Sequence, residues 1–567
     1  MTTSSLPGTT PNPMSTLLIN GRIFQSGAGP DNDAVFHSAM VVRDGVVQHV
    51  GSESDADIVA ARTSAVVHDL GGRTVLPGFV DGHVHLLTLG YSLNKVPLEG
   101  CRSLEDIRSV IKTYATAHPD VRRILCRNWM FSMTPGEVTA AMIDDLDPRP
   151  IYIESKDLHA TWCNTAALKD LGLWDDLDRV VKGGTIHREA VTKQASGLLS
   201  EAVVFDLVWP HLSRVATLQE RTDAVAAAVQ VYTEQGYTGV VDMALQEEDL
   251  EAIINYIATC PNQRPPTRIS GYWLIKPRAT EAEHLAQVDR AIELAKMHNG
   301  ATGRGGELVP SLRVVGIKVV CDGIVDACTA ALTEPYGDSA RTAADAIWSP
   351  EMVTPVVQRA TEGGLQVALH AIGDKAITMA VDTIAKFSGQ KALRPRIEHL
   401  ELSSAEDAKR LGELGITASI QPVHADPAIL RAWPRLIGEH RCGRAFAYRE
   451  FHDAGAPIAI GTDAPTAPRD PLANAYIATT RRSAREPDAA DLSAVNPHFA
   501  LTLCQAVTAA TRGAAYSVFA DGETGSLAAG KAADFTVVNM EWEPSKLLSA
   551  VIEETWYAGQ QVYQKQR

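Results

Sequence analysis

The sequence predicts an α/β fold in which a parallel barrel of βα units carries a small β domain. Two observations support this expectation. Across residues 76–519, apolar runs of strand length alternate with helical stretches, which is typical of repeated βα units. Short alternating strands and glycine turns dominate both ends of the chain, at residues 17–75 and 525–564. We therefore expect the middle of the chain to close into a barrel and its two ends to pair.

Several segments show this pattern in chain order. Residues 18–21 and 40–50 predict short strands near the N-terminus, and residues 534–538 predict one near the C-terminus. Residues 218–235 and 355–363 have the periodicity of helices. The chain contains no internal repeat, which argues against a solenoid.

The first residues differ in composition from the rest. They are rich in Thr, Ser and Pro, so we expect a disordered tail there, and Met14 is an alternative start to Met1. The predicted domains are a tail at 1–14, a composite β domain from 15–75 and 520–567, and a barrel at 76–519.

Charge and composition limit the classes of partner. The 68 acidic and 52 basic residues give a formal charge of -16, which disfavours nucleic acid and anionic membrane surfaces. The chain contains no run of about 18 apolar residues that could span a membrane. Its eight cysteines are scattered, without a CxxC pair. We therefore expect reduced thiols, a cytoplasmic location and a small-molecule substrate. A homodimer is a further expectation, because large barrels of this kind often dimerise.

An apolar run at residues 75–80 leads into two histidines, His83 and His85. Side chains at positions i and i+2 of a strand point to the same face. On a barrel strand both imidazoles would face the lumen near the C-terminal rim, where they could share a divalent ion. The pair alone is a weak signal, because core or surface histidines with this spacing are common.

Three later residues, His370, His399 and Asp463, also stand at the ends of apolar runs of strand length. Each has an ordinary alternative explanation, as a satisfied core histidine or as an aspartate that begins a helix. All of these alternatives would have to hold at successive strand ends. The combined pattern therefore favours a metal site at the barrel rim.

Lys318 lies in an otherwise apolar run, residues 312–320. Burying an ammonium group is costly, so such a lysine must be paired, deprotonated or modified. A deprotonated lysine could react with carbon dioxide to form a carbamate, N6-carboxylysine, which is an anionic ligand able to bridge two metal ions. The alternative is a structural salt bridge to Asp242 or Asp322.

These motifs together resemble the amidohydrolase superfamily, in particular its N-substituted formamide deformylase-like branch, amidohydrolase family 3. The similarity spans nearly the whole chain. It is carried by residues 76–85, 318–323, 329–336 and 461–465 and by the motifs around His370 and His399. The branch is marked by residues 157–159, 163–168 and 197–202. The branch usually has a Gly-Trp pair where this sequence has Asn128-Trp129.

The resemblance implies a (β/α)8 TIM-like barrel with a small β-sandwich formed from both chain termini. The strand-like run at 268–274 is one more than eight strands require. The resemblance also implies one or two divalent metal ions, of the zinc type, and their number depends chiefly on Lys318. The implied metal ligands are His83, His85, Lys318, His370, His399 and Asp463.

Two of the implied residues have catalytic roles. Asp463 would accept the proton of the attacking water and deliver it to the leaving nitrogen. His159, which the resemblance places with Asn164 at the second strand, would polarise the substrate carbonyl; the alternative is that it braces its loop.

The expected activity is hydrolysis of a non-peptide C–N bond, of the amide or formamide type, by metal-activated water. Ester or lactone hydrolysis at the same site is an alternative, and a non-catalytic barrel is another. Nucleophilic catalysis ranks lower, because the chain has no G-x-S-x-G motif and Cys321 has no histidine near it in sequence. A partly apolar or aryl substrate is suggested by Trp129, Phe131, Trp162 and Trp348, although core packing explains each equally well.

Overall fold

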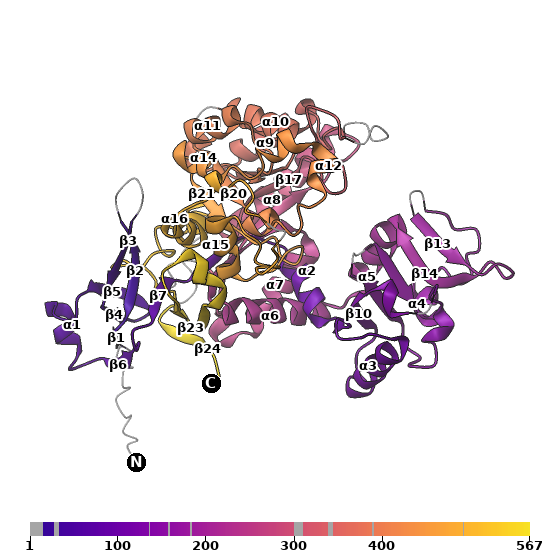
Figure 1. The fold of residues 1–567 in the computed structure, drawn as a ribbon, viewed down its shortest axis with the longest axis horizontal. Coiled ribbons are helices and arrows are strands. Elements are labelled where there is room, and N and C mark those ends of the chain that lie inside the picture. Colours follow the sequence, from indigo (N-terminus) through magenta and orange to yellow (C-terminus); the bar gives the residue numbers. More distant parts are fainter. Residues whose placement is uncertain are drawn as a thin grey trace, which may run out of the picture. The chain divides into compact units, whose positions relative to one another are not determined.

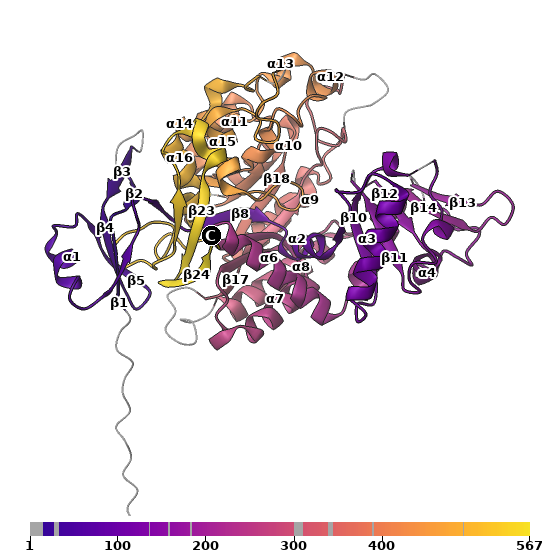
Figure 2. The ribbon, with the colours of Figure 1, turned by 60° about the horizontal axis from the view of Figure 1, so that its bottom comes forward.

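The computed structural model describes residues 15–27, 33–134, 136–156, 159–181, 184–299, 310–337, 344–387, 390–490 and 493–566. The chain divides into two compact units, which Figures 1 and 2 show from two directions. The first contains Met1–Leu86 and Val229–Arg567, and the second contains Leu87–Ala228. The predicted tail at 1–14, with both candidate start residues, lies outside the described residues.

The first unit contains an eight-stranded parallel sheet whose strands follow one another in chain order. The last strand returns to the first, because the Asp463 N–H donates to His83 O at 2.7 Å and the His85 N–H donates to Ala464 O at 3.0 Å. These bonds close the predicted barrel. Its strands are β8 (Phe79–Val84), β15 (Tyr237–Leu245), β16 (Arg268–Ile275), β17 (Leu312–Val320), β18 (Gln366–Ala371), β19 (Arg396–His399), β20 (Thr417–Ile420) and β21 (Ile458–Ile460).

Amphipathic helices alternate with the barrel strands. In α8 the apolar face buries Val288, Ala291 and Ala295, and the Thr280 side chain accepts the Glu283 N–H at its start. In α9 the first residue is Pro350, so this helix starts earlier than the predicted residue 355. The main helices are α6 (Leu218–Glu234), α7 (Glu247–Thr259), α8 (Glu281–His298), α9 (Pro350–Glu362), α10 (Asp374–Ala385), α11 (Ala405–Leu414), α14 (Tyr448–Asp453), α15 (Pro471–Thr480) and α16 (Leu503–Thr508).

Both chain ends build the predicted β-sandwich. In its mixed sheet, β22 from the C-terminal end pairs with β7 from the N-terminal end, with Val537 opposite Val75. Residues from both ends, such as Ile23, Met40 and Phe535, share one apolar core. One sheet has the order β5 (Val46–Gly51), β4 (Ala39–Arg43), β1 (Ser15–Ile19), β6 (Val66–Asp69); the other has the order β24 (Gln560–Gln564), β23 (Val551–Tyr557), β22 (Phe535–Asn539), β7 (Thr74–Pro77), β2 (Arg22–Ser26), β3 (Ala34–His37).

The second unit is built on its own six-stranded mixed sheet. Helix α3 packs Ile107 and Ile111 into a core that also contains Cys126 and Ile153. The elements of this unit are β9 (Val96–Pro97), α3 (Leu104–Ala117), β10 (Ile124–Trp129), β11 (Ile151–Ser155), β12 (Ala160–Cys163), α4 (Thr165–Asp170), β13 (Gly184–Arg188), β14 (Ala195–Glu201) and α5 (Trp209–Val215).

This unit differs from the sequence-based expectation of a continuous barrel across 76–519. The run between His159 and Asn164, expected at the second barrel strand, forms β12, which pairs antiparallel with β11 and β14. A parallel pair needs a crossover of about a dozen residues, whereas β11 ends at Ser155 and β12 begins at Ala160. The barrel instead reaches eight strands through β16, the run that had been one too many.

Asn128 illustrates how the backbone explains a departure from the related sequences. Its φ is +64°, in the left-handed region that glycine adopts freely and asparagine tolerates best among other residues. A glycine and an asparagine are therefore both suited to this position. Among the helices of the described residues, none is long and apolar enough to cross a bilayer.

Candidate metal centre

The predicted ligands lie at the carboxyl ends of the barrel strands. His83 lies in β8 and His85 directly follows it, so strand alternation points both imidazoles the same way. Lys318 lies in β17, and His370 and His399 lie in β18 and β19. Asp463 follows β21. Since the carboxyl ends of parallel barrel strands meet at one rim, residues far apart in the sequence converge there.

The distances show how closely these side chains approach one another. Asp463 Oδ1 lies 3.1 Å from His85 Nε2 and 3.5 Å from His83 Nε2. The ring centroids of His83 and His399 are 4.9 Å apart, and those of His370 and His399 are 4.4 Å apart. Four imidazoles and a carboxylate therefore gather in one small volume.

The alternative explanation for Asp463, as the start of a helix, does not hold. The next helix is α15, and its N-cap is Asp470, whose side chain accepts the N–H groups of Leu472 and Ala473. Asp463 has φ +59° and lies in the loop that joins β21 to this helix. Its carboxylate is directed to the histidine cluster rather than to a helix terminus.

Lys318 is buried, with 2% of its surface exposed. Among the described residues it forms no ion pair, and the two predicted salt-bridge partners accept hydrogen bonds from backbone N–H groups instead. Asp242 accepts the N–H groups of Leu86 and Ala244, and Asp322 accepts three backbone N–H groups. Burial lowers the pKa of the Lys318 ammonium group. The alternative of a structural salt bridge to Asp242 or Asp322 is therefore not formed.

A buried carboxylate orients the first histidine. His83 Nδ1 donates to Glu398 Oε2 at 2.7 Å, and Arg396 Nε donates to Glu398 Oε1 at 2.6 Å. Arg396 also donates to Gly82 O and to the Ser419 hydroxyl. Burial opposes ionisation of Glu398, but Arg396 and His83 hold its pKa well below the ordinary value. With Nδ1 engaged in this way, His83 presents Nε2 to Asp463, the arrangement common to metal-binding histidines.

A second buried carboxylate ties the first and last strands together. Asp81 accepts the Thr462 N–H at 2.9 Å and the Tyr232 hydroxyl at 2.7 Å. It also accepts the His83 N–H at 3.1 Å. These bonds fix the backbone on both sides of the metal centre, at His83 and one residue before Asp463.

Burial disfavours the charged form of three of the histidines, whereas at His85 the hydrogen bond to Asp463 outweighs burial and raises the pKa. Burial lowers the pKa of His83 to about 4 and that of His370 to about 3, and the charge of Lys318 acts in the same direction. Burial also holds the pKa of His399 well below its ordinary value. Only a neutral imidazole has a lone pair for a metal ion, so these three rings are ready to bind one at neutral pH.

The donor set fits a borderline divalent ion. His370 Nε2 and His399 Nδ1 are buried and have no hydrogen-bond partner among the described residues. A tetrahedral zinc ion with bonds of about 2.0–2.1 Å holds its ligand atoms about 3.3 Å apart. The separations of 3.1 and 3.5 Å around Asp463 Oδ1 bracket that value. Imidazole nitrogens with a carboxylate oxygen are the ligands that zinc prefers in catalytic sites.

Sequence reasoning missed His424. This residue lies in the short 3-10 helix at Pro422–Ala425, after β20, and its Nε2 is 3.7 Å from Asp463 Oδ2. It forms a second potential metal-binding group with His399 and Asp463. The sequence contains a signal for it, a histidine four positions after the strand Thr417–Ile420. The sequence analysis considered only histidines directly at strand ends and therefore missed it.

The residues predicted from the branch motifs lie in the second unit. His159 Nδ1 is 2.9 Å from Glu201 Oε2, an exposed ion pair, while Asp157 and Leu158 lie outside the described residues. Asn164 is the N-cap of α4, where it accepts the Ala167 N–H. The Asn164 side chain therefore has a structural task in this unit.

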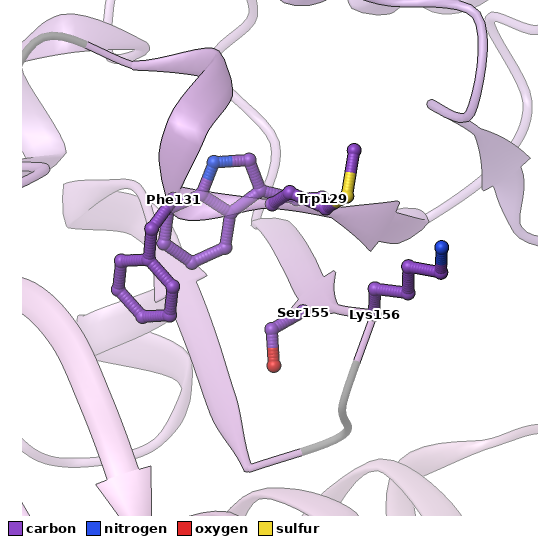
Figure 3. A pocket seen from close by; sticks show the side chains of 5 residues that line it. Trp129, Phe131, Ser155 and Lys156 are labelled. Carbon is purple, nitrogen blue, oxygen red and sulfur yellow. The ribbon is translucent and has the colours of Figure 1, made fainter. Parts of the chain in front are cut away.

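The second unit also contains a pocket of about 430 Å³. Figure 3 shows the rings of Trp129 and Phe131 close together in its wall, with Ser155 and Lys156 on other sides. The two ring centroids are 4.5 Å apart. All three tryptophans singled out in the sequence, Trp129, Trp162 and Trp348, are fully buried, whereas Phe131 is 49% exposed.

The competing thiol chemistry has no support in the structure. Cys321 is completely buried, and burial together with Asp322 raises the pKa of its thiol far above the ordinary value. A catalytic thiol needs a lowered pKa and an accessible position.

Comparisons with known proteins identify the family of this chain. The family model described as "Amidohydrolase family" matches residues 66–563. Protein LONG AFTER FAR-RED 3 from Arabidopsis thaliana is 29% identical over 564 residues, which cover 96% of this chain and 91% of that protein. N-substituted formamide deformylase from Arthrobacter pascens is 23% identical over 521 residues, which cover 89% of this chain and 90% of that protein.

A solved structure shares the fold. The crystal structure of an uncharacterized metal-dependent hydrolase from Pyrococcus horikoshii superposes with a TM-score of 0.75 at 23% identity, covering 94% of this chain and 98% of that one. The family match spans most of the sequence and confirms the predicted resemblance. The chain belongs to the amidohydrolase family.

Proposed function

We propose that this protein hydrolyses a non-peptide C–N bond, of the amide or formamide type, in a small substrate with an apolar or aryl part. The observation that carries the proposal is the cluster of His83, His85, His399 and Asp463 at the barrel rim, in which three imidazoles surround a carboxylate. The full-length similarity to N-substituted formamide deformylase supports the choice of bond.

The residues that would hold a divalent ion, zinc in our proposal, are His83, His85, His370, His399 and Asp463. A carboxylated Lys318 would add an anionic oxygen ligand. When bound, such an ion makes hydroxide available near neutral pH and withdraws charge from a carbonyl oxygen.

Side chains of the protein would accept and donate the protons of the reaction. Asp463 is ionised, because the imidazoles around it hold its pKa well below the ordinary value against the effect of burial. Its carboxylate would accept the proton of the attacking water and deliver it to the leaving nitrogen, so that an amine rather than an amide anion departs. Glu398 and Arg396 would keep His83 in the required orientation.

His159 is proposed to support the developing negative charge on the substrate oxygen. The proposal is based on its place in the branch motif. The chemistry requires an N–H donor on its ring, and the ion pair with Glu201 fixes the ring through Nδ1. Replacement of His159 by Gln should then lower kcat while zinc content stays unchanged.

The apolar or aryl part of the substrate follows the expectation drawn from aromatic residues of the sequence, Trp129 and Phe131 among them. Ligand pockets commonly have volumes of about 300–1,000 Å³ and apolar walls with a few polar groups. The pocket of about 430 Å³ beside Trp129, Met130 and Phe131 has this size and character, with Ser155 and Lys156 as its polar groups.

The test is an activity panel with purified protein and added zinc. N-aryl formamides, N-alkyl formamides, acylated amino acids, and esters or lactones of matched size are compared by kcat/KM. We expect the N-substituted formamides or other amides to be cleaved fastest. Preference for esters or lactones would overturn the proposed bond specificity, and absence of turnover on every substrate with stoichiometric metal present would overturn the hydrolytic proposal.

A further inference from the structure

We propose that the second unit contains a nucleophilic serine site, formed by Ser200, His187 and Glu137, that cleaves carboxylic esters. His187 Nε2 lies 3.3 Å from Ser200 Oγ, and His187 Nδ1 lies 2.9 Å from Glu137 Oε1. A hydroxyl, an imidazole and a carboxylate joined in this order are the parts of an activated serine, which is recognised by geometry rather than by position in the sequence. The inference goes beyond the proposed function, because all three residues lie in the second unit and none is a proposed metal ligand.

The strands that carry Ser200 and His187 place both side chains on one face of the sheet. β13 and β14 are antiparallel neighbours (Figure 1), and Thr185 lies opposite Ser200, so these two residues share a face. His187 follows Thr185 by two positions, which returns its side chain to that face. The register between the strands shifts here, between Ile186 and Arg188. Bulges of this kind redirect a side chain and are common beside active sites, and the residue at the shift is His187.

The loop that carries Glu137 is anchored to the same sheet. The next residue, Val138, is completely buried in the apolar core of this unit. The Trp162 Nε1–H donates to Thr139 O at 2.9 Å, and Trp162 belongs to β12, the other neighbour of β14. Contacts of the two residues that follow Glu137 therefore hold its carboxylate within reach of His187.

The hydrogen bonds select the form of His187 that can activate a hydroxyl. When the Nδ1–H donates to Glu137, the neutral ring has its lone pair on Nε2, where it accepts the Ser200 hydroxyl proton. The distance of 3.3 Å is slightly above the range of about 2.6–3.2 Å for a working pair, and such distances shorten when substrate binds. Ser200 is partly buried and the His187 side chain is 31% exposed, so a substrate can reach both.

The reaction has two steps that balance in atoms and protons. Ser200 Oγ forms a bond to the acyl carbon of the ester while His187 Nε2 takes the hydroxyl proton. The C–O bond to the alcohol then breaks, and the alcohol leaves with that proton. Water attacks the acyl-serine in the second step. His187 takes one proton of the water and returns it to Ser200 Oγ as the carboxylic acid leaves.

The aromatic pocket of the second unit borders the same face of this sheet. Ser200 lies opposite Ala160 on β12, and the Ala160 N–H donates to Ser155 Oγ at 2.9 Å. Ser155 lines the pocket together with Trp129 and Phe131. Neighbouring strands lie about 4.8 Å apart, so β14 and β11, with β12 between them, are about 10 Å apart. An ester whose acyl chain ends in an aryl ring can therefore place that ring in the pocket while Ser200 attacks its carbonyl carbon.

The test is covalent labelling of the full-length, zinc-loaded protein with a fluorophosphonate probe, which forms a bond to an activated serine oxygen and releases fluoride. Mass spectrometry of the digested protein identifies the labelled residue. The variants are Ser200→Ala, His187→Gln and Glu137→Gln. The control is Ser196→Ala, because Ser196 lies on the same strand and has no hydrogen-bond partner among the described residues. Circular dichroism of each variant checks its fold.

We expect the label on Ser200 in the wild type and in Ser196→Ala. His187→Gln should slow the labelling at least about 100-fold, as for loss of a general base. Glu137→Gln should slow it by about 5-fold, because the ion pair with His187 is exposed to water.

Ester hydrolysis gives an independent measurement. Hydrolysis of 4-nitrophenyl 3-phenylpropanoate should continue after a chelator has removed the zinc, and it should stop in Ser200→Ala. Its kcat/KM should exceed that of 4-nitrophenyl acetate by about 2–12-fold, the worth of one aromatic contact.

Three outcomes would overturn the inference. They are a wild type in which Ser200 stays unlabelled, a folded His187→Gln variant that is labelled at the wild-type rate, and ester hydrolysis that stops without zinc but continues in Ser200→Ala. The last result would assign ester hydrolysis to the metal centre. Failure of the proposed function is distinguishable, since it would appear as a zinc-loaded protein that cleaves no formamide or other amide, whatever the state of Ser200.

Discussion

Replacement of Glu398 by Gln should weaken zinc binding without removing any metal ligand. Glu398 is completely buried, accepts from His83 Nδ1 at 2.7 Å and pairs with Arg396 at 2.6 Å. The amide has nearly the same shape as the carboxylate but carries no charge. His83 keeps a neighbour of similar size, while the negative charge that fixes its orientation and strengthens it as a ligand is lost.

The expected magnitude has two parts. Loss of a carboxylate behind a metal-binding histidine weakens metal affinity by about 10–100-fold, which is about 1.4–2.7 kcal/mol. Breaking a buried ion pair costs about 3–5 kcal/mol of stability, because it leaves an uncompensated charge. Arg396 still donates to Gly82 O, Ser419 and Ser517, so we expect the lower end of that range.

The assay is a zinc titration of metal-free wild type and Glu398→Gln against a competing chelator, with urea unfolding of the same samples. The control is Glu554→Gln in the β-sandwich. Glu554 is also buried and also borders a histidine, with His68 Nε2 at 3.1 Å, but it lies in neither metal-binding cluster. The control should lose stability and keep its zinc affinity. A folded Glu398→Gln that binds zinc as the wild type does would refute the reasoning.

Three further predictions concern the proton acceptor, the protonation of the ligands and the substrate pocket. Asp463→Asn should keep the fold, by circular dichroism, and lose about 10²–10⁴-fold in kcat, as expected for removal of a general acid–base group; near-normal turnover would contradict its role. In the metal-free protein, burial lowers the pKa of His370 to about 3. Between its ordinary pKa of about 6.5 and this value, the unfolded state binds more protons than the folded state. The free energy of unfolding therefore falls as the pH falls, by about 2 kcal/mol at pH 5. His370→Asn should therefore show a flatter pH dependence of its urea midpoint between pH 7 and 5, and parallel profiles would count against a buried neutral imidazole. Phe131→Ala should raise KM for an N-aryl formamide by about 2–12-fold, the worth of one aromatic contact, with KM for N-methylformamide unchanged; equal effects on both substrates would exclude the pocket from recognition of the aryl group.

The local pattern of the sequence was sufficient to place the proposed ligands at the ends of barrel strands. His83, His85, His370 and His399 each stand at or near the end of an apolar strand, and the carboxyl ends of such strands meet at one rim whatever the order of the helices. The period of two along a strand also placed His83 and His85 on one face. These inferences need only neighbours in sequence and the rule that parallel strands share a direction.

Contacts between side chains that are distant in the sequence could not be predicted from the sequence. Glu398 lies 315 positions from the histidine that it orients, and no local signal distinguishes it from other carboxylates. Whether Lys318 had a salt bridge depended on where the side chains of Asp242 and Asp322 pointed, which their backbone partners decided. The β12 strand looked like a barrel strand because strand propensity does not encode the direction of its neighbour.

The sequence by itself determined the fold class and the places of His83, His85, His370, His399 and Asp463 at or near strand ends, because strand ends and residue types are local properties. Only the tertiary structure brought His424 to Asp463 Oδ2. Its position depends on a short turn that Asn474 fixes from a later helix, and contacts of that kind arise from packing rather than from any repeating pattern along the chain.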